Sequence, residues 1–394
     1  MSTPLSAGLA PAAPDPIFGA GDAARRDPRP DRLDLVVGLY VDPSGEVPVM
    51  AAVREAETRL AAAGGSKRYL PIGGSPAFTG PMGELLFGAP LPARVELLGT
   101  PGGTGALRAA MELVADIRPA ASLLVAEPTW PNHLAIAAAA GLPVRTLAHL
   151  DVQGAFDLPG HLAAIATARP GDAVLLHASC HNPTGIDPAP AEWAKLAAAI
   201  AERRLVAILD LAYQGLGTGL AEDAVALRAF TGSEAEFLVA ASASKNAGLY
   251  AERVGALAIA GADAPSTAVI AGHARSRIRA AWSNPPAHGE AIVATILADA
   301  SLRAAWSTEL DAMRERIAIH RAALAAACAA AGIAASGIAA GHGMFALLGL
   351  DDAAREALAR DHAIHTAPGG RINLAALAPA DAPRVAAALV AVRG

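Results

Sequence analysis

Five runs of mostly apolar residues, separated by Ala-rich stretches, constrain the fold of this chain more than any other feature. The runs are ASLLVAEP (121–128), AVLLHASC (173–180), VAILDLAY (206–213), FLVAASAS (237–244) and VGALAIAG (254–261). Continuous apolar runs of this length suit strands that are covered on both faces, and the stretches between them suit helices. The alternation predicts an α/β fold, with a mostly parallel sheet covered by helices.

The length of the chain and the pattern near its end predict a second, smaller domain. At 394 residues the chain is longer than one simple core accommodates. GMFALLGL (343–350) and GRINLAAL (370–377) are typical of strands, and they flank a predicted helix at 351–361. We therefore expect an N-terminal arm and small-domain segment at 1–45, a large domain at 46–309 and a small α+β domain at 310–394.

Two segments lack a clear strand or helix pattern. Residues 10–32 are rich in Pro, Asp and Arg, which favours an extended arm over the surface or onto a partner. Residues 322–341 form an uncharged 20-mer, but its Ala and Gly content is too weakly hydrophobic for insertion into a membrane. We interpret it as a helix end followed by a turn and a strand.

Composition argues against several classes of protein. Apolar residues make up 53% of the chain and charged residues 17%, which excludes a disordered chain. The net charge of −6 without a basic stripe disfavours a nucleic-acid partner. Two cysteines, Cys180 and Cys328, form neither a disulfide framework nor a metal site alone, which fits a reducing cytoplasm. The first 14 residues contain no Lys or Arg, so they lack the charged start of a signal peptide.

Polar residues follow the apolar runs at the points where the predicted strands end. In sheets of this class, ligands bind at the carboxyl ends of the strands, so these residues are expected on one rim. They are Trp130, Asn182, Asp210, Tyr213, Ser242, Ser244 and Lys245. A lysine in this place can be a surface charge, an ion-pair partner, or an amine that forms a Schiff base with a carbonyl compound.

The other residues expected on this rim favour a Schiff base between Lys245 and a carbonyl compound. A cofactor such as pyridoxal phosphate needs an amine, a carboxylate for its ring nitrogen, phosphate donors and a flat side chain over its ring. Asp210 offers the carboxylate, with a helix cap or an ion pair as its alternative role. Tyr213 offers a donor to a ring oxygen, with ordinary core packing as its alternative. TPGGTGALR (100–108) is a Gly-rich turn into a helix, as phosphate sites require. Further phosphate donors are Ser242, Ser244 and Arg253.

The same Gly-rich turn also suggests dinucleotide binding, which its residues disfavour. From Gly103 the pattern G-x-G is present, but Arg108 stands at the third glycine position. We also expect no apolar strand directly before the turn. The phosphate of a carbonyl cofactor is therefore the better interpretation.

With these residues in order, the chain resembles the class I aminotransferases of pyridoxal-phosphate fold type I, specifically the aspartate/aromatic-amino-acid aminotransferase subgroup. The resemblance extends from the N-terminal arm almost to the end of the chain. The stretches that carry it are RPDRLDLVVGLYVDPSGEVPV, KRYLPIGGSPAFTGPMGELLFG, TPGGTGALR, PTWPNH, HNPTGIDP, DLAYQGLGTGLAEDAVALRAF, SASKNAGLYAERVGA, RAAWSNPPAHGEAIVATILAD, GMFALLGL and GRINLAAL.

The resemblance implies roles for the residues in these stretches. Lys245 would form the Schiff base with the cofactor and then move the substrate proton. Asp210, supported by His133, would hold the ring nitrogen. Tyr213 and Asn182 would contact the ring oxygen, and Trp130 would stack on the ring. Taken singly, Trp130 and His133 also fit ordinary core positions.

The resemblance further implies a homodimer with shared active sites. Arg371 would bind the substrate α-carboxylate, and Arg279 would arrive from the neighbouring subunit to meet a side-chain carboxylate. Taken singly, Arg279 also fits a solvated basic helix face. Gly38, Trp130 and Asn182 would complete the substrate site. The phosphate would be held by Gly103, Thr104, Ser242, Ser244 and Arg253, with Tyr69 reaching in from the other subunit.

The identity of the substrate follows from charge and apolar character. Two carboxylate-binding arginines favour transamination with 2-oxoglutarate over a lyase or decarboxylase on the same fold. In the family that the chain resembles, members that prefer aromatic substrates carry bulkier apolar residues in the segment at the pocket entry; Leu39, Val41 and Val47 are apolar, so the resemblance favours an aromatic amino acid (Phe, Tyr or Trp). Against this preference, Arg68, Thr104 and Asn284 differ from the residues that the resemblance leads us to expect in members that prefer aromatic substrates. We therefore expect an aromatic-amino-acid aminotransferase that also accepts aspartate and glutamate, with an aspartate aminotransferase as the alternative.

Overall fold

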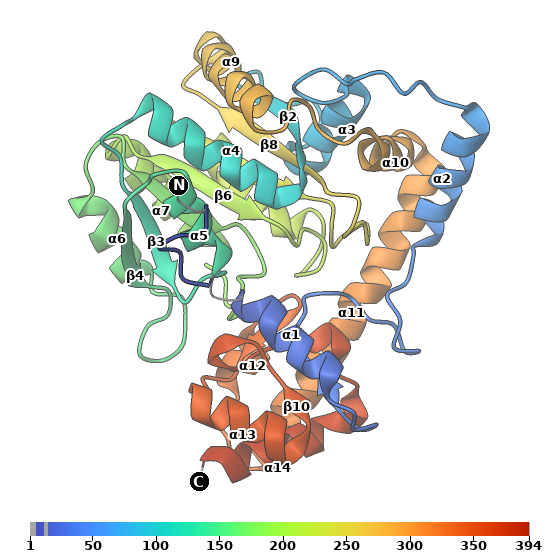
Figure 1. The fold of residues 1–394 in the computed structure, drawn as a ribbon. Helices are drawn as coiled ribbons and strands as arrows, with labels where there is room; N and C mark the ends of the chain where they lie inside the picture. Colours follow the sequence, from blue (N-terminus) through green and yellow to red (C-terminus); the bar gives the residue numbers. More distant parts are fainter. Residues whose placement is uncertain (1–4, 12–14, 394) are drawn as a thin grey trace.

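The computed structural model describes residues 5–11 and 15–393 (Figure 1). Parts of the expected N-terminal arm, at 1–4 and 12–14, lie outside the described residues. Within the described ranges, no helix is long and apolar enough to cross a membrane.

A seven-stranded sheet forms the centre of the larger part of the molecule. Its strand order is β2-β8-β7-β6-β5-β3-β4. β8 is antiparallel to β2 and β7, and the other neighbours are parallel, so the predicted mostly parallel sheet is confirmed. The strands are β2 (Val95–Pro101), β3 (Leu123–Glu127), β4 (Val144–Ala148), β5 (Ala173–His177), β6 (Val206–Leu211), β7 (Glu236–Ser242) and β8 (Val254–Ala260).

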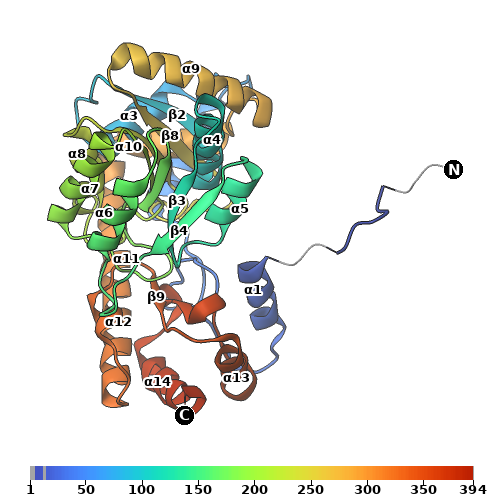
Figure 2. The same cartoon turned by 90° about the vertical axis from the view of Figure 1, so that its left-hand side faces the viewer.

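Helices cover both faces of this sheet, as continuous apolar strands require. Successive strand residues point to opposite faces, so Ile208 packs into one core and its neighbour Leu209 into the other. Figure 2 shows the two helix layers on either side of the sheet. One layer has α4 (Gly102–Ile117), α5 (Asn132–Ala139) and α9 (Ala264–Ala281). The other has α3 (Pro76–Phe87), α6 (Leu158–Thr167), α7 (Pro190–Glu202), α8 (Val225–Thr231) and α10 (Ala287–Ala298).

The smaller part of the molecule combines both ends of the chain. β1 (Leu33–Asp34) pairs in parallel with β10 (Ile364–His365), and β9 (Phe345–Leu347) pairs antiparallel with β11 (Arg371–Asn373). Its helices are α1 (Pro16–Arg26), α12 (Ser336–Ala340), α13 (Asp352–His362) and α14 (Ala382–Arg393). Short 3-10 turns of this part lie at Pro368–Gly370, Leu374–Ala376 and Pro379–Asp381. A further 3-10 turn, Glu222–Ala224, lies between β6 and α8 of the large part.

Two long segments join the parts. α2 (Ala51–Ala63) packs against α10 and α11, and α11 (Ala300–Ala330) runs from the large part into the small one (Figure 1). The expected boundary at 309 falls inside this continuous helix. The boundaries at 45 and 309 therefore stay a prediction.

Three local expectations were wrong. The arm at 10–32 contains helix α1, because Asp15 accepts hydrogen bonds from the amides of Ile17 and Phe18 at 2.9 Å and Pro16 begins the helix. Within 322–341 the chain forms helix α12 where a strand was expected. β2 directly precedes the Gly-rich turn, although we expected no strand there.

Candidate active site

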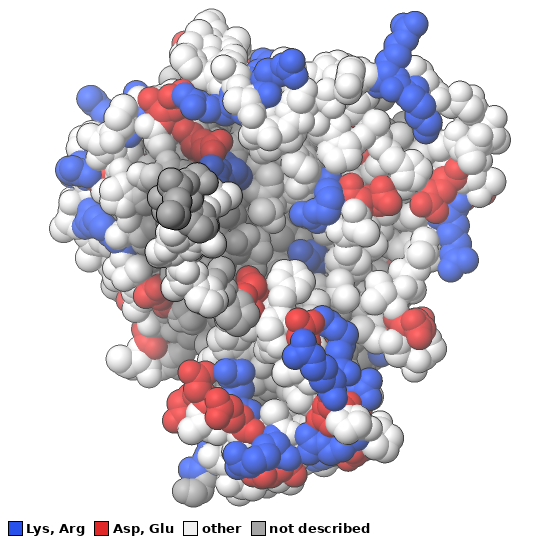
Figure 3. Space-filling model, viewed as in Figure 1, with Lys and Arg blue, Asp and Glu red and all other residues white. Residues whose placement is uncertain are grey.

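A cavity of about 310 Å³ lies at the carboxyl ends of the strands, between the large sheet and the small part. Figure 3 shows this face hollowed between α1 and the large part, with basic side chains on the wall of the hollow. The cavity brings together most of the predicted site residues. Those that line it are Gly38, Gly103, Thr104, Trp130, Asn182, Asp210, Tyr213, Ser242, Ser244, Lys245, Arg253 and Arg371.

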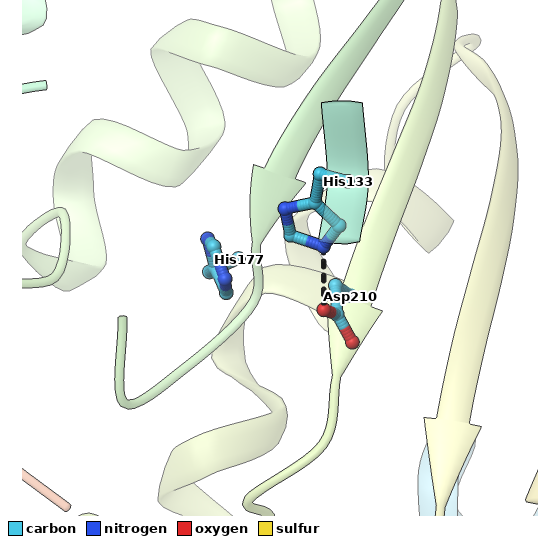
Figure 4. A group of neighbouring side chains, drawn as sticks. All are labelled: His133, His177 and Asp210. Carbon is cyan, nitrogen blue, oxygen red and sulfur yellow. Dashed lines mark hydrogen bonds and ion pairs between the residues drawn. The ribbon is translucent and has the colours of Figure 1, made fainter. Parts of the chain in front are cut away.

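Asp210, near the end of β6, is a buried carboxylate held by one histidine. Nε2 of His133 donates to Oδ2 of Asp210 at 2.9 Å, and Thr129 Oγ1 lies 2.8 Å from Nδ1 of the same ring (Figure 4). Burial acts to raise the pKa of Asp210, but the His133 hydrogen bond and nearby positive groups outweigh it, so the pKa is lowered. The carboxylate is thus kept ionised.

The same carboxylate belongs to a group of three side chains of the types that bind metal ions. Potential ligand atoms of His133, His177 and Asp210 lie within 4.8 Å of one another, and Figure 4 shows His177 beside the hydrogen-bonded pair. Both nitrogens of His133 are already engaged with Asp210 and Thr129. The arrangement is therefore a hydrogen-bonded carboxylate that faces the cavity.

Lys245 lies just after β7, on the wall of the cavity. Its Nζ is 5.4 Å from the centroid of the Tyr213 ring. Burial lowers the pKa of Lys245 to about 8; Asp210 opposes this shift, and Arg253 and Arg371 add to it. About a tenth of this amine is consequently neutral at pH 7.

The turn before α4 makes a cradle for an anion. Gly102 has φ of 75°, and a Cβ there would lie 2.6 Å from Nη2 of Arg253. A Cβ on Gly103 would lie 3.2 Å from Cβ of Ser242. These glycines let the start of a 16-residue helix approach a guanidinium and a hydroxyl closely. Helix N-termini and arginines both bind phosphate, so a cofactor phosphate fits this cradle.

Arg371 is a buried cation with unused hydrogen-bonding capacity. It is 4% exposed, and its Nη1 and Nη2 donate to Asn182 Oδ1 at 3.2 Å and to Val36 O at 2.6 Å. Its Nε has no hydrogen-bond partner among the described residues, and the guanidinium lies 4.3 Å from the centroid of the Phe345 ring. A Cβ on Gly38 would lie 2.6 Å from Cζ of Phe345, so this arrangement requires a glycine. Such a site suits a carboxylate.

Two predicted site residues do not reach the cavity in this chain. Tyr69 is 92% exposed, and Arg279 is an exposed residue whose Nη1 donates to Ser283 Oγ. Tyr69 lines a separate cavity of about 410 Å³. Its neighbours there are Arg68, Leu70, Pro101, Trp282, Asn284, Pro285, Pro286 and Ala287.

Some residues at the cavity escaped the sequence analysis. Ile17 and Phe18 from α1 line it, together with Val37. The Asp15–Pro16 pair was the available signal, because Asp before Pro is typical of a helix start. Leu39, Val41 and Val47, on which the aromatic preference rested, do not line the cavity.

The comparison with known proteins decides the family. Residues 30–389 match the family described as aminotransferase class I and II. The chain belongs to this family. The aminotransferase is 41% identical to an aspartate aminotransferase of Salmonella typhi, over 96% of this chain and 97% of the relative. It is 40% identical to an aromatic-amino-acid aminotransferase of Pseudomonas aeruginosa, over 96% of both chains.

The fold of this aminotransferase is confirmed by a solved structure. The aromatic-amino-acid aminotransferase of Burkholderia pseudomallei superposes with a TM-score of 0.94, at 39% identity, over 99% of this chain and 100% of that one. In that crystal structure the protein is covalently bound to pyridoxal phosphate. The predicted family, fold type and enzyme class are therefore correct.

Proposed function

We propose that this aminotransferase uses pyridoxal phosphate to transfer the amino group of an aromatic amino acid to 2-oxoglutarate, and that it also accepts aspartate and glutamate. The observation that carries the proposal is the joint presence, in one cavity, of the Lys245 amine, the Asp210 carboxylate, the glycine cradle and the Arg371 guanidinium. When bound, the cofactor supplies an electron sink for the charge that develops at the substrate Cα.

The residues of the chain divide the remaining tasks. Lys245 would hold the cofactor aldehyde through its amine; once the substrate amine has taken its place, the released amine would move the proton at the substrate Cα, which a lowered pKa favours. Asp210 holds the proton of the ring nitrogen, since His133 keeps its carboxylate ionised. Tyr213 and Asn182 contact the ring oxygen, and Trp130 covers the ring face. Gly103, Thr104, Ser242, Ser244 and Arg253 hold the phosphate.

Substrate orientation falls to Arg371. Its buried guanidinium would bind the α-carboxylate, and Asn182 fixes the orientation of the group from the other side. Gly38 leaves room for the Phe345 ring on which the guanidinium rests. The clamp therefore serves both the amino acid and the 2-oxo acid.

The preference for an aromatic side chain now rests on Ile17, Phe18 and Val37. These residues form an apolar part of the cavity wall, and burial of a phenyl ring against them would contribute about 2 kcal/mol. The named relatives act on aspartate or on aromatic amino acids, so an aspartate aminotransferase is the second candidate. A lyase is disfavoured because it has no need for two arginines that bind carboxylates.

The proposal includes a homodimer. Tyr69 and Arg279 are exposed in the single chain, and we assign them to the cavity of the partner subunit, where they would meet the phosphate and a side-chain carboxylate. We also propose a cytoplasmic location, which the free, buried thiols of Cys180 and Cys328 support.

The half-reaction tests this function. Purified enzyme with bound cofactor is mixed with phenylalanine or with aspartate, without any 2-oxo acid, and the shift in cofactor absorption on amination is followed. We expect both amino acids to react with the enzyme, and kcat/KM to be at least as high for phenylalanine as for aspartate. The Lys245→Ala variant should give no absorption shift with either amino acid. Reaction with aspartate alone would favour the second candidate, and silence with both would refute transamination.

A further inference from the structure

Glu290, in the first turn of α10, is a buried carboxyl group outside the cavity of the proposed active site. It is 2% exposed. Its Oε2 accepts a hydrogen bond from the backbone N–H of Ser75 at 2.9 Å, and its Oε1 is buried without a partner in the part of the chain that the structure describes. Burial raises the pKa of Glu290 to about 7, so the group is partly neutral near physiological pH. A buried carboxyl group is costly to keep, which calls for an explanation of its place.

Two glycines make room for this side chain. A Cβ on Gly99 would lie 2.0 Å from Glu290 Oε1, and a Cβ on Gly74 would lie 2.7 Å from the same atom. The two glycine segments are joined directly, since Gly99 N donates to Gly73 O at 2.8 Å. Three parts of the chain therefore meet at Glu290: the start of α10, β2, and the segment 73–75 before α3.

Of these three parts, the one before α3 depends most on Glu290. β2 is paired with β8 along its whole length, from Val95–Ala260 to Pro101–Val254. The preceding segment, 65–69, has no helix or strand, and its residues are exposed. The Ser75 N–H bond to Glu290 and the Gly99–Gly73 bond thus anchor the chain at 73–75, within six residues of Tyr69, and the exposed segment 65–69 leads into this anchor.

The helix that carries Glu290 also connects to Arg279, the second residue that we assign to the partner's cavity. α10 follows directly on the turn at 282–286, which follows Arg279 at the end of α9. The two segments meet in the second cavity, where Tyr69 and Arg68 face Trp282, Asn284 and their neighbours. One carboxyl group therefore connects the segment of Tyr69 with the segment of Arg279.

We propose that Glu290 is a positioning residue that holds Tyr69 and Arg279 in the arrangement in which they enter the cavity of the partner subunit. The role rests on the proposed dimer with shared active sites. It differs from the assignment of Tyr69 and Arg279 themselves, because Glu290 touches neither cofactor nor substrate. Its loss is expected to weaken cofactor and dicarboxylate binding in the partner's cavity and to leave the cavity of its own chain unaffected.

Mixed dimers with two different affinity tags separate these two cavities. In the first dimer, a subunit with both Glu290→Ala and Lys245→Ala pairs with an unaltered subunit, so the one competent cavity receives Tyr69 and Arg279 from the altered subunit. In the second dimer, a Glu290→Ala subunit pairs with a Lys245→Ala subunit, and the competent cavity receives both residues from a chain with intact Glu290. The control is an unaltered subunit paired with a Lys245→Ala subunit.

We expect the KM for 2-oxoglutarate and the Kd for pyridoxal phosphate to rise roughly fivefold or more in the first dimer, as for the loss of one buried hydrogen bond. The second dimer should match the control. Equal impairment of both dimers, or impairment of the second alone, would overturn the proposal. A monomer in size measurements would instead refute the shared active site.

Two further variants guard against a simple loss of folding. Glu290→Gln keeps an oxygen acceptor for the Ser75 N–H and should restore both constants to the control values. Ser75→Pro removes the donor from the other side, and the φ of −79° at Ser75 suits proline. Placed in the first dimer instead of Glu290→Ala, it should reproduce the rise. A Ser75→Pro dimer with control values, or a Glu290→Gln dimer that remains impaired, would contradict the role.

Discussion

Nε2 of His133 lies 2.9 Å from Oδ2 of Asp210, and both groups are buried at the end of the central sheet. An ionised carboxylate only accepts hydrogen bonds, so this ring nitrogen carries a proton. The second nitrogen is engaged with Thr129 Oγ1, which fixes the orientation of the ring. The carboxylate is thereby kept as a hydrogen-bond acceptor, as the proposed contact with the ring nitrogen of the cofactor requires.

Replacement of His133 by Phe should weaken cofactor binding. The variant leaves Asp210 buried without its donor, which costs about 1–3 kcal/mol, or roughly 5- to 150-fold in the Kd for pyridoxal phosphate. Equilibrium dialysis measures this constant, and His133→Gln, which offers an amide donor, serves as the matched variant. Unchanged affinity in His133→Phe would show that the hydrogen bond does not support Asp210.

Lys245 should react with amine reagents at unusually low pH in the cofactor-free protein. Burial lowers its pKa from 10.5 to about 8, so the midpoint of its labelling by acetic anhydride should lie near pH 8. Between pH 8 and 10.5 the unfolded chain retains this proton and the folded chain has lost it, so the contribution of Lys245 to stability rises with pH there. Asp210→Asn should shift the midpoint lower still, since Asp210 raises this pKa. A midpoint near pH 10 would contradict the lowered pKa.

Substitution of Arg371 by Lys should raise the KM for amino acids and 2-oxo acids alike. A lysine is a point charge, so it cannot reproduce the contacts to Asn182 and Val36 and still offer a planar donor pair to a carboxylate. We expect kcat/KM to fall roughly 30- to 150-fold, which corresponds to a loss of about 2–3 kcal/mol in transition-state stabilisation. Steady-state kinetics with both substrates measures it. An effect on only one of the two substrates would exclude a shared clamp.

Gly99→Ala should destabilise the protein through Glu290. The new Cβ would lie 2.0 Å from Oε1, and the displaced carboxyl group would lose its bond to Ser75, at a cost of about 1–3 kcal/mol in the free energy of unfolding. In a Glu290→Ala background the contact with Oε1 is absent and the nearest remaining atom is Gly74 Cα at 3.2 Å, so the same substitution should cost about 1 kcal/mol less than in the unaltered protein. Equal costs in urea unfolding of the two backgrounds would show that Gly99 and Glu290 act independently.

The sheet could be predicted from the sequence where its strands are covered on both faces, and less well at its edges. The five apolar runs became β3, β5, β6, β7 and β8. β2 and β4 lie at the two edges of the sheet. The edge strand β4, with Arg145 and Thr146, is largely exposed, and β2 contains Glu96 and Gly99, so neither has a continuous apolar pattern.

The residues of the candidate site, like the strands, could be predicted only where the nearby sequence indicates them. Lys245 follows a strand and Asp210 lies near the end of one, so both could be expected on one rim from that placement, whereas Arg371 was indicated only by the family resemblance. Tyr69 and Arg279 are on exposed parts of the chain, and no pattern within one chain indicates a cavity to which they could contribute. In the sequence Glu290 resembles an ordinary charged residue in a helix, because its burial depends on Gly74 and Gly99, which lie far earlier in the chain.

The central claim is that the amine of Lys245 binds the cofactor aldehyde covalently. The chain contains three lysines, and the other two, Lys67 and Lys195, are exposed. Borohydride reduction of the protein loaded with pyridoxal phosphate, followed by peptide mass spectrometry, identifies the modified amine. We predict one modification per chain, at Lys245. An unmodified Lys245, or modification of Lys67 or Lys195 in its place, would contradict the account.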